Sequence, residues 1–120
     1  MSSILVIEDS AFTRRKICHV LTSMGHQVAE ADNGCTGLEL AQNTQPDVIF
    51  LDLLMPEMDG IEVLKQLQIK NIQSSVIVLS ADVQETTRQE CLSLGASHCL
   101  GKPPKSEELV KVLNDIHCLA

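Results

Sequence analysis

The stretch Val48-Ile49-Phe50-Leu51-Asp52-Leu53-Leu54-Met55-Pro56 is an apolar run that contains one carboxylate and stops at a proline. Pro46 precedes it, so the run is short and is bounded by proline on both sides. Such a run is typical of a strand buried on both faces, as in a parallel sheet. A carboxylate at the end of such a strand lies at the carboxyl edge of the sheet, where open α/β folds place their sites. We therefore take Asp52 as the centre of a predicted site.

Apolar runs elsewhere in the chain predict further strands. With the central strand over 47–52, the predicted strands are 3–8, 26–30, 76–80 and 97–101. The run at 26–30 is less apolar, which is typical of an edge strand. Apolar residues at helical spacing predict five helices. One lies within 11–24, one contains Leu38 and Ala41 and ends near Asn43, one has Ile61, Leu64 and Leu67 on one face, one runs to about residue 93, and one carries Leu109, Leu113 and Ile116 in a stripe.

Capping and turn signals mark the ends of these helices. The expected N-caps are Ser10 or Asp9 for the first helix, Asp82 (at capping-box spacing from Glu85) for the fourth and Ser106 for the fifth. Gly25 and Gly95 are expected to end the first and fourth helices. Asn33-Gly34 and Asp59-Gly60 are expected in turns or loops. Alternation of strands and helices predicts an α/β fold, with a parallel sheet covered by helices on both faces. We expect one domain over residues 1–120 and no output domain.

Composition narrows the class of protein. Apolar residues make up 44% of the 120 residues, enough for a packed core. No apolar run approaches the ~20 residues that cross a bilayer, and no basic region precedes the first apolar residues, so we expect a cytoplasmic protein without membrane insertion. A net charge of −7 argues against direct binding to nucleic acid. The basic cluster Arg14-Arg15-Lys16 is read as a solvated helix face.

The numbers and positions of cysteine, histidine and aromatic residues argue against several further kinds of site. Five cysteines, at positions 18, 35, 91, 99 and 118, are scattered and indicate neither a disulfide framework nor a zinc site. Four histidines, at positions 19, 26, 98 and 117, are interpreted as surface residues or as core residues with satisfied hydrogen bonds. Phe12 and Phe50 are the only aromatic residues, too few to stack bases or flavins.

Polar residues follow or end four of the predicted strands. They are Glu8 and Asp9 after the first, Asp52 in the third, Ser80 in the fourth and Lys102 after the fifth. Parallel strands end at one edge of the sheet and lie about 5 Å apart, so these side chains are expected to meet if their strands are neighbours. Crowded carboxylates repel each other, and Mg²⁺ relieves that repulsion with oxygen ligands and retained waters.

This set of groups suits phosphoryl transfer. The reaction needs a nucleophilic carboxylate, which would be Asp52, and compensation of the developing charge. Lys102 adds a positive charge and Ser80 adds a hydroxyl donor. Each residue alone is commonly a cap or a loop residue, and only their joint placement at strand ends supports the hypothesis.

Several motifs together resemble the receiver domains of response regulators. They are Glu8-Asp9-Ser10, the run Val48 to Asp52, Met55-Pro56-Glu57-Met58-Asp59-Gly60, Ser80-Ala81, Gly95-Ala96-Ser97 and Lys102-Pro103. The resemblance covers essentially the whole chain, in order and at matching spacing. It implies a flavodoxin-like, doubly wound (βα)5 sandwich with strand order 2-1-3-4-5.

The resemblance also implies a role for each site residue. Asp52 would be the phosphoacceptor, and Asp9, Asp52 and the backbone carbonyl of Leu54 would bind Mg²⁺, with Glu8 acting through water. Lys102 would contact the phosphoryl group and would be joined to Pro103 by a cis bond. Ser80 would be the switch hydroxyl, and the small Ala81 would leave access to the site and donate its backbone N–H. The phosphoryl donor would be a sensor histidine kinase or a histidine phosphotransfer protein. The output would be binding to a downstream protein target or a phosphatase, as in single-domain receivers of the chemotaxis and phosphorelay types. Self-catalysed phosphorylation and dephosphorylation would be weak.

Two positions depart from the family pattern. Cys99 stands three residues before the lysine, where the family usually has an aromatic switch residue, so a rotating ring cannot be the readout. Pro104 follows Lys102-Pro103, where the family often has an aromatic residue. The family's usual partner face, formed by the fourth helix, fifth strand and fifth helix, is therefore expected to be less bulky here.

Two alternative functions remain at this point. A phosphohydrolase with an aspartyl nucleophile typically has a second Asp two residues later, but that position is Leu54. A flavodoxin-like electron carrier shares the fold, but Glu8 and Asp9 would repel a flavin phosphate after the first strand.

Overall fold

The chain alternates strands and helices from end to end. The computed structural model describes residues 2–53, 59–81 and 84–118. The strands are β1 (Ser3–Ile7), β2 (Gln27–Ala31), β3 (Val48–Asp52), β4 (Ser75–Ser80) and β5 (His98–Gly101). The helices are α1 (Ala11–Ser23), α2 (Gly34–Thr44), α3 (Gly60–Ile69), α4 (Glu85–Ser93) and α5 (Ser106–Cys118). The five predicted strands and five predicted helices are confirmed, with ends that differ by one or two residues.

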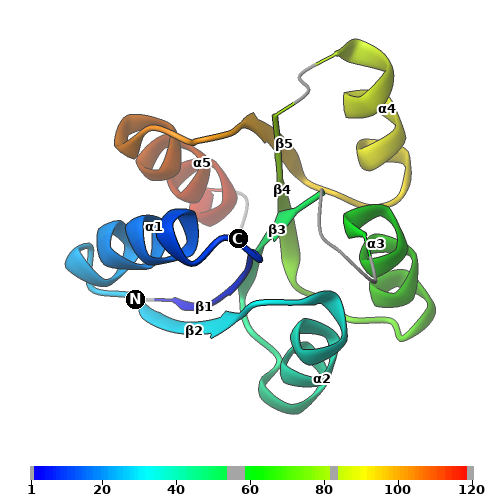
Figure 1. Ribbon diagram of the computed structural model, residues 1–120, viewed down its shortest axis with the longest axis horizontal. Coiled ribbons are helices and arrows are strands. Elements are labelled where there is room, and N and C mark those ends of the chain that lie inside the picture. Colours follow the sequence, from blue (N-terminus) through cyan, green and yellow to red (C-terminus); the bar gives the residue numbers. More distant parts are fainter. Residues whose placement is uncertain (1, 54–58, 82–83, 119–120) are drawn as a thin grey trace.

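All five strands form one parallel sheet in the order β2-β1-β3-β4-β5 (Figure 1). This is the strand order that the resemblance implied, and β2 lies at an edge as its composition predicted. β1, β3 and β4 are neighbours in the middle of the sheet, which is the condition for their polar end residues to meet.

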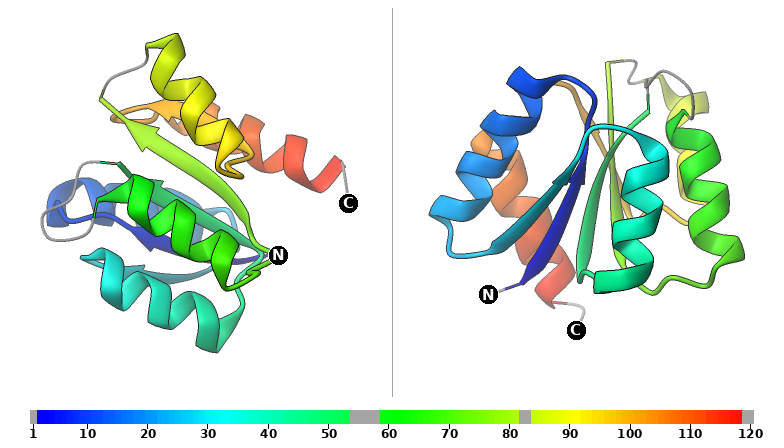
Figure 2. Two further views of the ribbon diagram at one scale, coloured as in Figure 1. Left: turned by 90° about the vertical axis from the view of Figure 1, so that its right-hand side faces the viewer. Right: turned by 60° about the horizontal axis from the view of Figure 1, so that its bottom comes forward.

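The residues of each central strand divide between two separate apolar cores. In β3, Ile49 and Leu51 pack into one core and Val48 and Phe50 into the other, and all four are fully buried. Helices α2, α3 and α4 cover the first core, and α1 and α5 cover the second (Figure 2). A strand with both faces covered has no polar side, which explains the uninterrupted apolar run in the sequence.

Polar side chains begin three of the helices close to the carboxyl edge of the sheet. The Ser10 hydroxyl accepts from the Thr13 N–H at 3.3 Å and caps α1, as predicted. Asn33, predicted as a turn residue, caps α2 by accepting from the Thr36 N–H at 2.8 Å. Asp59 likewise caps α3.

The starts of α4 and α5 differ from the prediction. Helix α4 begins at Glu85 with Gln84 in the cap position, and the predicted cap Asp82 lies outside the described residues. Ser106 is the first residue of α5 rather than its cap. The carbonyl of Lys105 accepts from the Leu109 N–H at 3.1 Å, so the helical bonding starts one residue earlier than expected.

Glycines follow α1 and α4 as predicted. Gly25 and Gly95 have φ of +91° and +103°, in the left-handed region that terminates helices. Within the described residues, none of the helices combines the length and the apolar character needed to cross a membrane.

Candidate functional site

The carboxyl edge of the sheet gathers the predicted polar residues. Ile7 of β1 pairs with Leu51 of β3, so Glu8 follows directly beside Asp52, the last residue of β3. Ser80 ends the neighbouring strand β4, and Lys102 follows the end of β5. The topology therefore brings together groups that are far apart in the sequence.

Lys102 forms the electrostatic link between the two buried carboxylates. Its Nζ lies 2.7 Å from Oε1 of Glu8 and 3.1 Å from Oδ2 of Asp52. Glu8 is 0% exposed and Asp52 is 1% exposed, so both acids are withdrawn from water. The backbone N–H of Lys102 donates to the carbonyl of Ser80 at 3.0 Å, which ties the lysine to the end of β4. The peptide bond from Lys102 to Pro103 is cis, as the resemblance implied.

Burial and neighbouring charge change the ionisation of two of these groups. Burial and, to a smaller extent, the adjacent Asp52 raise the pKa of Glu8, Lys102 opposes them, and together they bring it to about 8. Burial alone lowers the pKa of Lys102, but Glu8 and Asp52 outweigh that effect and raise it above its ordinary value. Near neutral pH the metal-free site therefore holds a charged lysine and a Glu8 that is largely protonated.

Three carboxylates are close enough to share one cation. Glu8, Asp9 and Asp52 each offer an oxygen, and these atoms lie within 4.8 Å of one another. Asp9 is exposed while the other two are buried, so this group opens to solvent on one side. In the described part of the chain, neither carboxylate oxygen of Glu8 accepts a well-directed hydrogen bond. Hard oxygen donors with an open side fit Mg²⁺, which keeps several waters.

Ser80 and Ala81 occupy the rim that the resemblance assigned to them. Ser80 is 4% exposed and pairs with Gly101 across β4 and β5. Ala81 is exposed immediately after it. Leu54, expected to offer its backbone carbonyl to the metal, lies outside the described residues, as does the motif Met55 to Met58.

Arg14 is a site neighbour that the sequence analysis missed. It was read as part of a solvated helix face, but its side chain is only 15% exposed. Its Nη1 donates to the backbone carbonyl of Glu8 at 2.8 Å, and its Nε donates to Oε1 of Glu30 at 2.9 Å. The missed signal is helical phase, since Arg14 precedes the buried Ile17 and Cys18 by three and four residues and shares their face.

Gly60 is a second residue with an unrecognised role. Its N–H donates to the carbonyl of Leu53 at 2.9 Å, just after Asp52. A Cβ at this position would lie 2.6 Å from the Asp52 carbonyl oxygen and 2.6 Å from the Leu53 Cα. Both are backbone atoms that cannot move aside, so the first turn of α3 packs directly against the end of β3.

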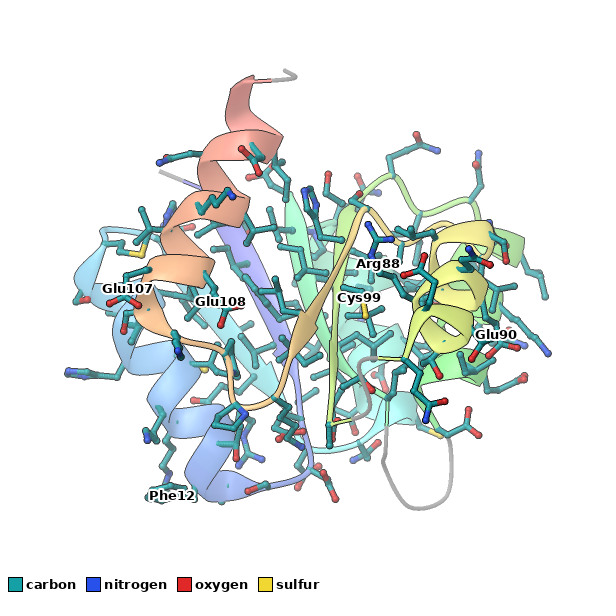
Figure 3. All side chains as sticks on the ribbon, turned by 90° about the horizontal axis from the view of Figure 1, so that it is seen from above. Phe12, Arg88, Glu90, Cys99, Glu107 and Glu108 are labelled. Carbon is teal, nitrogen blue, oxygen red and sulfur yellow. The ribbon has the colours of Figure 1, made fainter. Side chains whose placement is uncertain are left out.

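Cys99 lies on β5 between α4 and α5 (Figure 3), at the position where receiver domains usually have an aromatic switch residue. It packs against the core beneath α2, α3 and α4, and burial raises the pKa of its thiol. The neighbouring His98 is only partly a surface residue. It was interpreted as a surface histidine, but its side chain is 29% exposed. Its Nε2 lies 4.0 Å from Oδ2 of Asp115, and its Nδ1 is buried with no hydrogen-bond partner among the described residues. His26 is satisfied, because its Nδ1 accepts from the Ser2 N–H.

Comparison with known proteins identifies the class of this site. Residues 4–114 match the family described as "Response regulator receiver domain". The chemotaxis protein CheY of Bacillus subtilis is 34% identical over 92% of this chain and 93% of its own length. Protein PilH of Pseudomonas aeruginosa is 35% identical over 97% of this chain and 98% of its own length.

Solved structures show the same architecture. The receiver domain of the Francisella response regulator 1452 superposes with a TM-score of 0.92 at 32% identity, covering 98% of this chain and 97% of that one. A chain from the CheX-CheY-BeF3-Mg+2 complex of Borrelia burgdorferi has a TM-score of 0.91 at 27% identity, covering 96% of this chain and 88% of that one.

Proposed function

Because this chain belongs to the response regulator receiver family, we propose that it is a stand-alone response regulator that accepts a phosphoryl group on Asp52. Receiver domains of the CheY type are signalling proteins rather than catalytic enzymes. The observation that carries the proposal is the contact of Lys102 with Asp52 at 3.1 Å and with Glu8 at 2.7 Å, beside the exposed Asp9.

The proposed transfer uses the groups that lie together at the carboxyl edge of the sheet. An oxygen of Asp52 attacks the phosphorus of a phosphohistidine on a kinase or phosphotransfer protein, and an O–P bond forms as the P–N bond breaks. The electron pair of the P–N bond returns to the imidazole, which is protonated on its other nitrogen and leaves as neutral histidine. Lys102 neutralises charge that develops on the phosphoryl oxygens. The hydroxyl of Ser80 donates to the product phosphoryl group, which reports the change to β4.

Glu8, Asp9 and Asp52 would hold Mg²⁺, Glu8 through a water molecule and the other two directly. When bound, the cation offsets the repulsion between these carboxylates and the incoming phosphate. Leu54 would add its backbone carbonyl. Asp9 is the exposed member of the set, so it is the side from which a hydrated ion enters.

The output proposed for this protein is phosphorylation-dependent binding to a downstream target or a phosphatase. The structural relative from Borrelia burgdorferi was solved as a complex of CheX with CheY, BeF3 and Mg²⁺, which supports a protein partner of this kind. In this chain the face around β5 carries Cys99 in place of an aromatic ring. The signal would therefore travel through displacement of Ser80 and β4 rather than through ring rotation.

Asp52→Asn tests the proposed function. The substitution removes the nucleophile while it keeps the shape of the side chain, so uptake of phosphate from acetyl phosphate with Mg²⁺ should be lost. Intact-protein mass spectrometry measures the uptake, and circular dichroism checks that the fold persists. Asp47→Asn is the matched control, because Asp47 lies just before the opposite end of β3 and should not affect uptake. Uptake by D52N at the wild-type level would refute the assignment.

A further inference from the structure

Arg14 lies on α1 with its guanidinium group turned towards the acidic site. It joins two groups, the backbone carbonyl of Glu8 at 2.8 Å and the carboxylate of Glu30 at 2.9 Å. We propose that Arg14, held by Glu30, is a positioning residue that sets the acidic pair Glu8-Asp9 for Mg²⁺ binding. The inference rests on the proposed metal site and adds a residue that does not touch the metal.

The geometry explains how one hydrogen bond can orient two carboxylates. The carbonyl of Glu8 belongs to the peptide group that joins Glu8 to Asp9. A peptide group is planar, so an anchor on its oxygen orients the Cα atoms on both sides. The N–H of Glu8 donates to the carbonyl of Ala31 at 3.0 Å, which extends the β1–β2 pairing by one residue. The Glu8 backbone is therefore held at both its N–H and its carbonyl.

Glu30 sets the direction of the arginine. It lies on the edge strand β2, and its side chain is 46% exposed. The guanidinium group presents donors in a rigid fork, so one contact through Nε orients the Nη1 that holds Glu8. A lysine in this place would keep the charge but could not make both contacts in the same geometry.

Loss of Arg14 should change the affinity for Mg²⁺ in opposite directions, depending on whether Arg14 acts only through its charge or by positioning Glu8 and Asp9. Removal of a positive charge near a cation site should tighten Mg²⁺ binding by Coulomb attraction alone. Loss of the anchor should weaken it, because the Glu8-Asp9 segment must then be ordered when the metal binds. Substitution of residues that orient metal ligands commonly weakens binding by about 10-fold or more.

The test compares Arg14→Ala with Arg15→Ala, which removes the same charge from an exposed neighbouring residue. Backbone amide shifts are followed by NMR during a MgCl2 titration at constant ionic strength, with circular dichroism to check folding. We expect R14A to bind Mg²⁺ about 10-fold more weakly than wild type, and R15A to bind it equally or slightly more tightly. Arg14→Lys should also weaken binding, because its charge is kept and its fork is lost. Binding by R14A as tight as that of R15A would overturn the proposal.

A second readout needs no metal. In the metal-free protein, the Glu8 amide is expected to exchange its hydrogen faster in R14A than in wild type, while amides of β3 remain protected. If wild type showed no Mg²⁺ binding, the proposed metal site would fail, and this measurement would still decide whether Arg14 orders the segment. Unchanged exchange at Glu8 would show that it does not.

Discussion

The Glu8 carboxyl group is buried completely, yet a cationic partner, Lys102, lies 2.7 Å away. Burial favours the neutral acid and Lys102 favours the carboxylate. Burial prevails, and with the added repulsion from Asp52 it raises the pKa from 4.5 to about 8. Glu8 is thus an acid whose charge depends on what else occupies the site.

Stability of the metal-free protein should fall as pH rises from about 4.5 to about 8, the interval between the ordinary and the folded-state pKa of Glu8. In that interval the folded state binds more protons than the unfolded state, so a rise in pH favours unfolding. Below this pH interval, the stabilising contribution of protonated Glu8 is fully present. Urea unfolding followed by circular dichroism in the presence of a chelator measures this, since the chain has no Trp.

Glu8→Gln provides the control for this titration. The amide keeps the shape of the protonated acid and cannot ionise, so the difference in stability between wild type and E8Q isolates the contribution of Glu8. Wild type should lose stability relative to E8Q as pH rises. Parallel curves for the two proteins would contradict the raised pKa.

At the scale of elements, the site depends on the contact between the end of β3 and the start of α3. The Asp59 side chain caps α3 by accepting from the Glu62 N–H at 2.9 Å, and Gly60 lies against the backbone of Asp52 and Leu53. Asp52, the proposed phosphoacceptor, ends β3, and Gly60 at the start of α3 lies against it. The position of Asp52 is therefore coupled to the first turn of a helix later in the chain.

Gly60→Ala should destabilise the protein by about 1–3 kcal/mol through overpacking. The added Cβ would meet backbone atoms at 2.6 Å, and this outweighs the usual gain of roughly 1 kcal/mol from Ala over Gly within a helix. Urea unfolding followed by circular dichroism measures the change.

Gly25→Ala is the matched control, because it has open space around the added Cβ and only the strain of a φ of +91°. G25A should be destabilised by about 1–2 kcal/mol from backbone strain. Phosphate uptake on Asp52 should fall in G60A and remain in G25A. A G60A protein that gained stability would show that the close approach is not present in solution.

At the scale of the whole molecule, the parallel sheet places several charged groups at one edge while both of its faces are sealed. Glu8, Asp9 and Asp52 come from the ends of two strands, so their grouping exists only in the folded chain. A cation that binds this group binds the native state selectively. Metal binding and folding would therefore be coupled.

Mg²⁺ should stabilise the folded protein against urea. At a concentration about 10-fold above its Kd, the free energy of unfolding should rise by ~1.4 kcal/mol, with NaCl at equal ionic strength as reference. The gain should disappear in Asp9→Asn, which removes the exposed ligand and leaves the buried pair intact. Equal stabilisation by Mg²⁺ in D9N and wild type would mean that the cation binds elsewhere.

Much of the fold and of the site was predictable from local patterns. The apolar run Val48 to Asp52 predicts a strand buried on both faces, and alternation with helices predicts a parallel sheet. In such a sheet all strands end at one edge, so Asp52, Ser80 and Lys102 could be grouped without coordinates. Strand order followed from the resemblance and agrees with the structure.

Only the tertiary structure decided which side chains contact the site residues and change their pKa values. Arg14 was predictable as an inward-facing residue from its helical phase, but its contacts with Glu8 and Glu30 depend on how α1 packs beside β2. The raised pKa of Glu8 likewise depends on burial beside two residues far along the chain. Local sequence determines periodicity and therefore elements, whereas distances between side chains and their exposure to water arise only when remote segments pack together.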